Sequence, residues 1–261
     1  MGPYANVRVS VEDHVATLEI DHPPVNAIDR ETFEGLRAAF HEAVADGRVK
    51  AIVLAGARQR FVAGADIHEL AAMAGAQGAQ EMATATHALF LTIERSPKPV
   101  IAAISGRFCM GGGNELAMAC HIRIAEENVQ FAQREIRLGL IPGWGATQRL
   151  PRLVGLGKAV ELILTGDAID AQEAHRIGLI NAIVPVGSAV HEAKAMAGRL
   201  ASLSSVALAK ALDAIYTGLD VGYEEGLAHE IACFGEMAET EDMREGLRAF
   251  LEKREPAFKD R

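Results

Sequence analysis

Two glutamates, each near a glycine-rich turn, carry the clearest chemical signal in the sequence. Glu115 follows three consecutive glycines at 111–113, and Glu135 lies twenty residues further along the chain. A carboxyl group flanked by apolar residues can become partly buried, which raises its pKa and lets it exchange a proton near neutral pH. An ion pair between Glu135 and Arg134 or Arg137 is the structural alternative. The two acids therefore predict general acid–base chemistry, with an ion pair left open for Glu135.

Two glycine-rich turns each follow an apolar run that is typical of a buried strand. FVAGADI at 61–67 follows the run at 51–55, and the triplet 111–113 follows the run at 100–104 and precedes a helical segment. Glycines at such turns leave backbone N–H groups open to a ligand oxygen, and a helix N-terminus adds positive partial charge. Together the turns have the composition of an oxyanion hole. Each turn taken alone is also typical of an ordinary structural turn.

Other kinds of site fit the sequence less well. If Gly111 and Gly113 began a dinucleotide fingerprint, a third glycine would be needed at position 116, where the chain has Leu116. The histidines show no H-E-x-x-H or paired-ligand spacing, and Ser105 lies outside a G-x-S-x-G elbow. We therefore expect no metal, no redox cofactor and no serine nucleophile.

The elements that must position these residues are predicted from hydrophobic periodicity. Alternating or continuous apolar residues predict strands, of which the first two form an N-terminal hairpin. Asp29 can cap a helix whose apolar residues recur at helical spacing. The expected strands and β-like regions lie at 7–11, 15–20, 51–55, 100–104, 121–133 and 180–184.

The pattern changes to helical periodicity from about residue 152. We therefore expect an α/β core of about 190 residues followed by a helical C-terminal region of about 60 residues, with limits at 1–195 and 196–261. Small residues and two glycines at 71–80 predict a mobile loop.

Composition and charge limit the possible partners and compartment. The chain has 261 residues, 49% of them hydrophobic and 23% charged, with a net charge of −9. An acidic chain is a poor non-specific partner for nucleic acid or an anionic membrane, and we expect neither. The three cysteines lack C-x-x-C spacing, which favours a reducing compartment, and neither a leader pattern nor a membrane-length apolar run is present. We expect a cytoplasmic protein.

The sequence resembles the crotonase, or enoyl-CoA hydratase/isomerase, family over most of its length. The resemblance is densest at 61–67, 111–120, 131–155 and 164–185. It implies a spiral of ββα and βαβ turns, a helical C-terminal trimerisation region, and homo-oligomers that are trimers or dimers of trimers. It also implies an acyl-CoA thioester as substrate, with no separate cofactor, in fatty acid metabolism such as β-oxidation.

The resemblance also implies a role for each site residue. The backbone N–H groups of Ala65 and Gly112 would bind the thioester carbonyl oxygen. Glu115 would act as base on the attacking water, and Glu135 would supply the proton to C2. The backbone N–H of Gly143 would help to hold the water. The remaining expected substrate contacts are Ala63, Asp66, Ile67, His68, Trp144, Phe258 and Lys259, with the last two reaching the CoA across a subunit boundary.

Three positions depart from the family pattern. His68 stands where many relatives have Lys, and its mostly uncharged imidazole would be a weaker phosphate contact. His121 stands where Asp is common, a change we expect to be structural. Trp144 stands where a number of relatives have a small residue, so it lines or shortens the acyl pocket, or else only fills space.

Both glutamates together favour an enoyl-CoA hydratase. The alternative within the family is a Δ3-Δ2 enoyl-CoA isomerase, which would depend mainly on Glu135. The alternative of a different class is a non-catalytic acyl-CoA-binding subunit. Retention of both acids and both turns argues against this last alternative.

Overall fold

Six strands form the main sheet of the computed structural model, which describes residues 4–73 and 75–261. Their order is β1-β2-β3-β4-β6-β9, and a second, three-stranded sheet has the order β5-β7-β8. The first two strands pair antiparallel, and every later pair in the main sheet is parallel. The strands are β1 (Val7–Glu12), β2 (Val15–Ile20), β3 (Ala51–Gly56), β4 (Val100–Ile104), β5 (Phe108–Met110), β6 (Ile122–Glu126), β7 (Gln130–Ala132), β8 (Ile169–Asp170) and β9 (Ala182–Val184).

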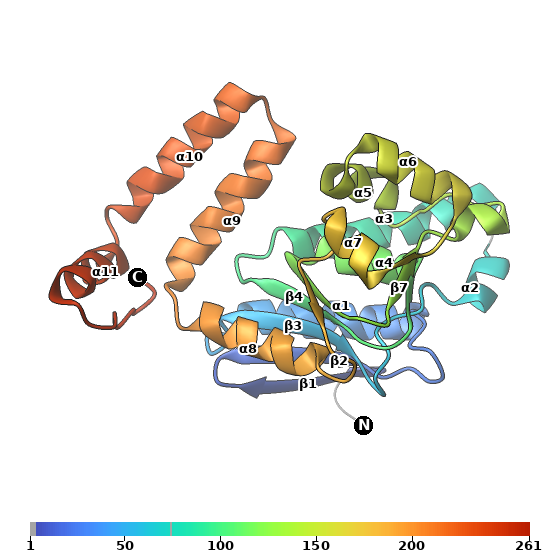
Figure 1. Ribbon diagram of the computed structural model, residues 1–261, viewed down its shortest axis with the longest axis horizontal. Helices are drawn as coiled ribbons and strands as arrows, with labels where there is room; N and C mark the ends of the chain where they lie inside the picture. The colour runs from blue at the N-terminus through green and yellow to red at the C-terminus, as the bar shows by residue number, and fades with distance from the viewer. Residues whose placement is uncertain (1–3, 74) are drawn as a thin grey trace.

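Helices cover this framework and extend beyond it (Figure 1). They are α1 (Arg30–Ala45), α2 (Ile67–Ala71), α3 (Gly75–Glu94), α4 (Gly112–Ala119), α5 (Ala146–Val154), α6 (Leu156–Thr165), α7 (Ala171–Arg176), α8 (Ala189–Ala201), α9 (Ser205–Asp220), α10 (Tyr223–Met237) and α11 (Glu241–Glu252), with a 3-10 turn, η1, at Glu135–Leu138. The carboxylate of Asp29 accepts from the backbone N–H of Thr32 and caps α1, which confirms that predicted helix start.

The central strands β3 and β4 are buried on both faces because they separate two apolar clusters, whereas the edge strand β1 is exposed over most of its length. Ile52 and Leu54 of β3 belong to one cluster, whereas Ala51 and Val53 belong to the other. Successive side chains of a strand point to opposite faces, so a strand covered on both sides must be apolar throughout. One cover is the alanine face of α8, made by Ala189, Ala193, Ala197 and Ala201. Small side chains there let the helix lie close to the strands.

The C-terminal helices differ from the core in burial. Helices α9 and α10 form an antiparallel hairpin that extends away from the sheet, and α11 follows α10 at the open end of the hairpin, opposite the α9–α10 turn (Figure 1). Within the described chain, α9 buries none of its residues and α10 buries one, Cys233. Residue 195, the expected limit of the core, lies inside α8.

The strands were predicted more accurately than the helix that follows α2. Each expected strand has a counterpart, and the β-like region 121–133 resolves into β6 and β7. The loop predicted at 71–80 is wrong for its second half, because α3 begins at Gly75. Alanine is a strong helix former, and Leu89, Phe90 and Ile93 bury one face of this helix against the core. Position 74 lies outside the described residues.

Candidate active site

Neighbouring strands of the second sheet bring the two glutamates together. β5 and β7 pair in parallel, with Met110 opposite Ala132. The N–H of Gly111 donates to the carbonyl of Ala132 over 2.9 Å, which extends the pairing by one residue. The chain after β5 then enters α4, which carries Glu115, while the chain after β7 enters η1, which begins at Glu135. Parallel pairing therefore places both acids at the same end of the sheet.

Glycine is required where the chain enters α4. Gly111 has a φ of +51°, and a Cβ at this position would lie 2.8 Å from a carboxylate oxygen of Glu135. At Gly112, a Cβ would lie 2.4 Å from the Trp144 ring. Both distances are shorter than real Cβ contacts, so a side chain here would displace the acid or the indole. The triplet therefore serves close approach as well as turn geometry.

The turn at 61–67 meets the glycine triplet. A Cβ built on Gly112 would lie 3.2 Å from the nitrogen of Ala65, and one built on Gly64 would lie 3.5 Å from the nitrogen of Gly112. Within residues 4–73 and 75–261, neither Ala65 nor Gly112 donates its N–H to a protein acceptor. The first residue of a helix has no intrahelical acceptor, so the N–H of Gly112 remains open to a ligand. Two open donors thus lie side by side.

These groups line a cleft of about 510 Å3. Eight of the residues predicted from the sequence are brought together there: Ala63, Ala65, Ile67, Gly112, Glu115, Glu135, Gly143 and Trp144. Apolar side chains make most of the remaining wall, among them Leu70, Met73, Met82, Leu138, Leu140 and Ile141. The cleft therefore combines an apolar wall with a small set of convergent polar groups, as ligand sites commonly do.

Glu115 lies at the deep end of the cleft and is 2% exposed. Its Oε1 accepts from the backbone N–H groups of Trp144 and Ala146, both at 2.9 Å. Burial raises the pKa of Glu115 to about 7, and the charge of Glu135 adds to the increase, while the two N–H donors oppose it. A carboxyl group with this pKa can gain and lose a proton near neutral pH.

Glu135 is half-buried, and burial also raises its pKa. The ion pair left open by the sequence does not form with Arg137, because the Arg137 guanidinium instead pairs with Asp167 at 2.5 Å. With its amide nitrogen facing the carboxylate, Gln133 donates to Glu135 at 3.1 Å and accepts from Asn114 at 3.3 Å. Two coupled carboxyl groups thus face one cleft, one deep and one near its opening.

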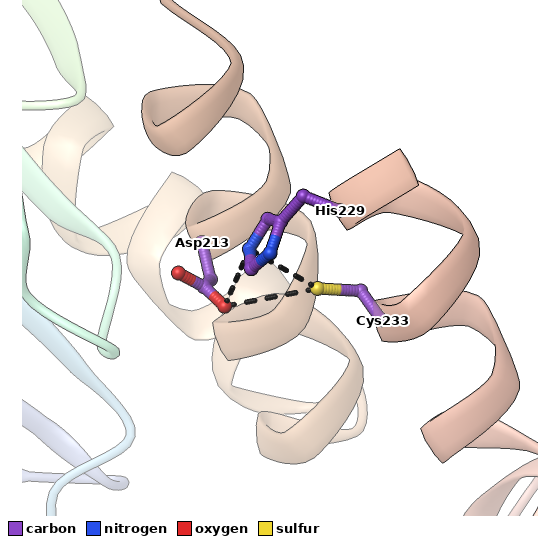
Figure 2. Close-up of side chains that lie close together, drawn as sticks. All are labelled: Asp213, His229 and Cys233. Carbon is purple, nitrogen blue, oxygen red and sulfur yellow. Dashed lines mark hydrogen bonds and ion pairs between the residues drawn. The ribbon is translucent and has the colours of Figure 1, made fainter. Parts of the chain in front are cut away.

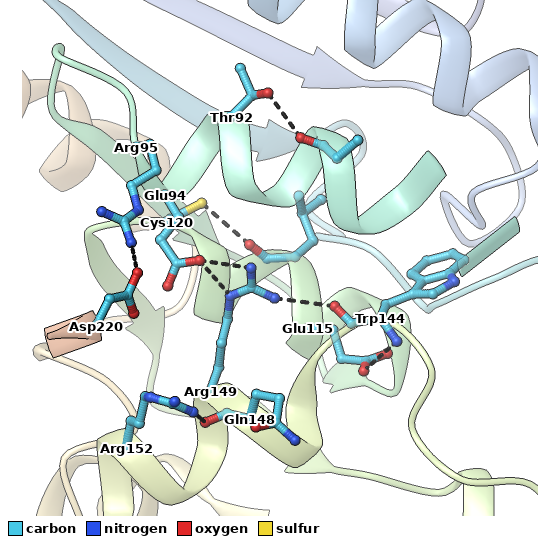
Figure 3. A network of polar contacts seen from close by, with 12 residues as sticks. Thr92, Glu94, Arg95, Glu115, Cys120, Trp144, Gln148, Arg149, Arg152 and Asp220 are labelled. Carbon is cyan, nitrogen blue, oxygen red and sulfur yellow. Dashed lines mark hydrogen bonds and ion pairs between the residues drawn. The ribbon is translucent and has the colours of Figure 1, made fainter. Parts of the chain in front are cut away.

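A buried ion pair that the sequence analysis missed supports the deep end (Figure 3). Arg149 is 8% exposed, and its guanidinium donates to the Glu94 carboxylate at 2.7 and 3.1 Å and to the carbonyl of Trp144 at 3.2 Å. The same residue, Trp144, presents its N–H to Glu115. Arg149 therefore holds the loop that orients the Glu115 carboxylate. No local pattern could reveal this pair, since its members lie 55 positions apart.

Four predicted substrate contacts lie outside the cleft. The carboxylate of Asp66 caps α2 by accepting from the backbone N–H groups of His68 and Glu69, and His68 itself is exposed. Phe258 lies beside Gly246 of α11, and the N–H of Lys259 donates to Asp242. The C-terminus and α11 lie far from the end of the fold that holds α2 (Figure 1). Within one chain, these residues do not meet the two glutamates.

The two unusual aromatic positions have defined environments. Nδ1 of His121 accepts from the N–H of Val100, so Nε2 carries the proton and donates to the Glu94 carbonyl. Burial lowers the pKa of His121 to about 4, which makes it a neutral structural residue as expected. The indole of Trp144 both lines the cleft and packs edge-on against Phe90, with ring centroids 6.0 Å apart. Trp144 therefore lines the cleft and also packs against the core, and its effect on the acyl pocket stays a prediction.

None of the helices in the described residues has the length and apolar character needed to cross a membrane.

Comparisons with known proteins agree with this geometry. The model of the enoyl-CoA hydratase/isomerase family matches residues 10–261. A probable enoyl-CoA hydratase of Bacillus subtilis is 42% identical over 254 residues, covering 97% of this chain and 98% of the relative. A short-chain-enoyl-CoA hydratase of Clostridium acetobutylicum is 41% identical over 259 residues, covering 98% of both chains. A crystal structure of enoyl-CoA hydratase from Bacillus anthracis superposes with a TM-score of 0.93 at 37% identity, covering 98% of this chain and all of the other.

Proposed function

The chain belongs to the enoyl-CoA hydratase/isomerase family, and on that premise we propose that it is an enoyl-CoA hydratase. The enzyme adds water across the 2,3-double bond of a trans-2-enoyl-CoA and gives the 3-hydroxyacyl-CoA. The observation that carries this proposal is the meeting of Glu115, Glu135 and the two open N–H groups of Ala65 and Gly112 in one apolar cleft. Water addition needs both a base and a proton donor, and the cleft supplies two acids.

The thioester carbonyl oxygen is held by the N–H groups of Ala65 and Gly112 in this proposal. Attack at C3 turns the thioester into an enolate, whose negative charge develops on that oxygen. Donors that are fixed before the reaction stabilise this charge without reorganising, and one such donor contributes roughly 3–4 kcal/mol in well-studied enzymes. The glycines at 64 and 112 support the assignment, because they let the two turns approach each other closely.

The two glutamates divide the proton transfers. Glu115 takes a proton from water as the water oxygen bonds to C3, and Glu135 gives a proton to C2 of the enolate. The deep carboxylate is held in one orientation by the N–H groups of Trp144 and Ala146, which suits a base that must aim at one water. The more open Glu135 is half-buried, which favours its protonated form. Gly143, beside this loop, is proposed to help hold the water.

The wall of the cleft favours a short apolar acyl group. The Trp144 indole lies against Gly112 and Phe90, so it cannot move aside easily for a longer chain. The Clostridium relative carries the name short-chain-enoyl-CoA hydratase. We therefore expect crotonyl-CoA to be turned over better than long-chain enoyl-CoAs. The cleft uses no metal and no redox cofactor in this proposal, so turnover should persist after EDTA dialysis.

Self-association into trimers or dimers of trimers is part of the proposal. The C-terminal helices expose large apolar side chains that a single chain leaves in water: Ile215, Leu219, Leu227, Ile231, Phe234, Leu247, Phe250 and Leu251. Exposed patches of this kind mark interaction surfaces. A neighbouring protomer would also be needed for Phe258 and Lys259 to reach a bound CoA. The cytoplasmic location expected from the sequence stays a prediction.

The direct test is incubation with crotonyl-CoA while the absorbance of its conjugated thioester is followed. Loss of that absorbance, with 3-hydroxybutyryl-CoA as product, is the expected result. An isomerase would instead convert a 3-enoyl-CoA to the conjugated isomer and leave crotonyl-CoA unchanged. Binding of crotonyl-CoA without turnover would point to an acyl-CoA-binding subunit.

A further inference from the structure

Three different metal-ligating side chains converge between α9 and α10 (Figure 2), the hairpin that extends away from the sheet (Figure 1). Asp213 comes from α9, and His229 and Cys233 come from α10, one helical turn apart. Nε2 of His229 lies 3.1 Å from Oδ2 of Asp213 and 3.5 Å from Sγ of Cys233, and that sulfur lies 3.7 Å from the same carboxylate oxygen. Residues four apart on a helix share one face, so the two α10 ligands point the same way.

We propose that Asp213, His229 and Cys233 bind a zinc-class divalent cation that fastens α9 to α10. The distances between the three ligand atoms agree with tetrahedral coordination of one zinc ion. Zinc binds Cys sulfur at about 2.3 Å, His nitrogen at about 2.0–2.1 Å and carboxylate oxygen at about 2.0–2.2 Å, so the edges of its tetrahedron measure about 3.3–3.7 Å. The three measured separations lie within a few tenths of an ångström of those edges. The fourth position is open to water.

A catalytic triad does not explain the same cluster. In a Cys-His-Asp relay the acid contacts one imidazole nitrogen and the thiol contacts the other. Here the carboxylate and the thiol both approach Nε2 of His229, so the ring cannot pass a proton between them. Convergence on one point suits a cation instead.

The surrounding charges and the hairpin itself are compatible with a bound cation. Lys210, whose positive charge acts on Cys233, is paired with Glu236 at 2.5 Å. The ligand set selects zinc over magnesium or calcium, because a thiolate is a soft ligand. Binding replaces the thiol proton, which passes to solvent, by a metal–sulfur bond, while His229 binds through its neutral Nε2. Since α9 buries no residue, a metal link would supply stability that the hairpin lacks as a single unit.

Cobalt and zinc binding to the full-length protein test the proposal. Co2+ should give an intense tetrahedral visible spectrum and a thiolate-to-cobalt charge-transfer band, and zinc, but not magnesium, should displace it. Zinc should raise the thermal midpoint of the wild-type chain relative to EDTA. Loss of even an outer partner of a metal ligand weakens binding about 10- to 100-fold, so Cys233→Ser and His229→Gln should weaken zinc binding at least that much.

His191→Gln, which changes an exposed histidine on α8, is the matched control and should bind as the wild type does. A pale octahedral cobalt spectrum without the charge-transfer band would overturn the proposal. Zinc binding that survives both ligand substitutions would overturn it as well. The wild-type cobalt spectrum is decisive even if a variant fails to fold, and it does not depend on hydratase activity.

Discussion

The sheet core and the C-terminal helices differ in how completely a single chain buries their apolar side chains. Every residue of β3 is buried, and its alternate side chains enter two separate apolar clusters. Helix α9 buries none of its residues, while Phe250 of α11 is 82% exposed. Removing apolar surface from water stabilises the folded state. The core therefore achieves this within one chain, whereas the C-terminal helices leave large apolar side chains in water.

The same contrast holds for polar groups. In the core, Glu115 and Arg149 are buried with hydrogen-bond partners from distant parts of the chain. On the C-terminal helices, pairs such as Arg254 with Glu245 lie closer to solvent. Exposed ion pairs contribute little to stability. Burial has a larger effect on an ionisable group, because it strongly shifts the pKa of that group. The paired acids of the cleft therefore lie in the core, and the large exposed apolar side chains lie on the C-terminal helices.

The largest expected effect comes from removing either acid of the cleft. Glu115→Gln and Glu135→Gln should each lower kcat for crotonyl-CoA hydration about 10²- to 10⁴-fold, with KM little changed, because general acid–base catalysis contributes on that scale. The double variant should lose much less than the product of the two factors, since both residues act on one water and one substrate. Steady-state kinetics measure all three.

Glu127→Gln is the control for these variants, because Glu127 is an exposed acid outside the cleft. Hydration by Glu115→Gln at the wild-type rate would contradict the assignment. If Glu135→Gln alone abolished conversion of a 3-enoyl-CoA, the chain would be an isomerase.

The burial of Glu115 should make activity and stability respond oppositely to pH. Its pKa is raised from 4.5 to about 7, so the folded chain holds this proton more tightly than the unfolded chain. That contribution to stability is present below about pH 4.5 and is lost as the pH rises through 7, amounting to about 3 kcal/mol at most. Activity should rise over the upper part of this range, because the base must be ionised.

Glu115→Gln should remove much of this pH dependence. The Gln carbonyl can still accept from the N–H groups of Trp144 and Ala146, so the variant should be more stable than the wild type at pH 8 and closer to it at pH 5. Denaturant unfolding at the two pH values measures the difference. If Glu115→Gln changed the free energy of unfolding by the same amount at both pH values, the folded chain would not hold the Glu115 proton more tightly than the unfolded chain does.

An exposed apolar residue of the C-terminal helices should affect assembly before it affects chemistry. Burying a Phe side chain contributes about 1.5–3 kcal/mol, so Phe250→Asp should weaken association of the protomers about 10- to 100-fold. Light scattering after size exclusion at several concentrations measures the shift. The control is Val9→Asp, at an exposed apolar position of β1 in the core. A wild-type chain that stays monomeric at micromolar concentration would refute the assembly.

The smallest expected effect separates positioning from packing. Lys lacks the planar guanidinium of Arg149, so Arg149→Lys should lose the hydrogen bond to the Trp144 carbonyl. We expect kcat to fall about tenfold, which corresponds to the net free energy of one hydrogen bond. Arg149→Met should also move the acidic limb of the pH profile upward, because the Arg149 charge lowers the pKa of Glu115. A charge-retaining Lys should restore that limb. An unmoved limb in Arg149→Met would leave Arg149 with a packing role.

Local patterns in the sequence determined much of this protein. Alternating or continuous apolar runs predicted β1 to β4, β6, β7 and β9 within a few residues, because burial on one or both faces demands those patterns, whereas the short strands β5 and β8 were not predicted. The glycines at 64 and 111–113 and the two glutamates predicted the composition of the cleft. The loop at 71–80 was partly wrong, because contacts of α3 with the core outweighed the local glycine signal.

Only the tertiary structure decided what those residues can do. Burial in the folded chain raises the pKa of Glu115 to about 7, although a loop 29 to 31 positions away donates two backbone N–H groups that oppose the increase. The Arg149–Glu94 pair and the Asp213, His229 and Cys233 cluster likewise join separate helices. A residue type supplies an ionisable group, but its proton affinity and its ligands depend on which distant segments fold around it. That information lies in contacts between segments and not in any local pattern.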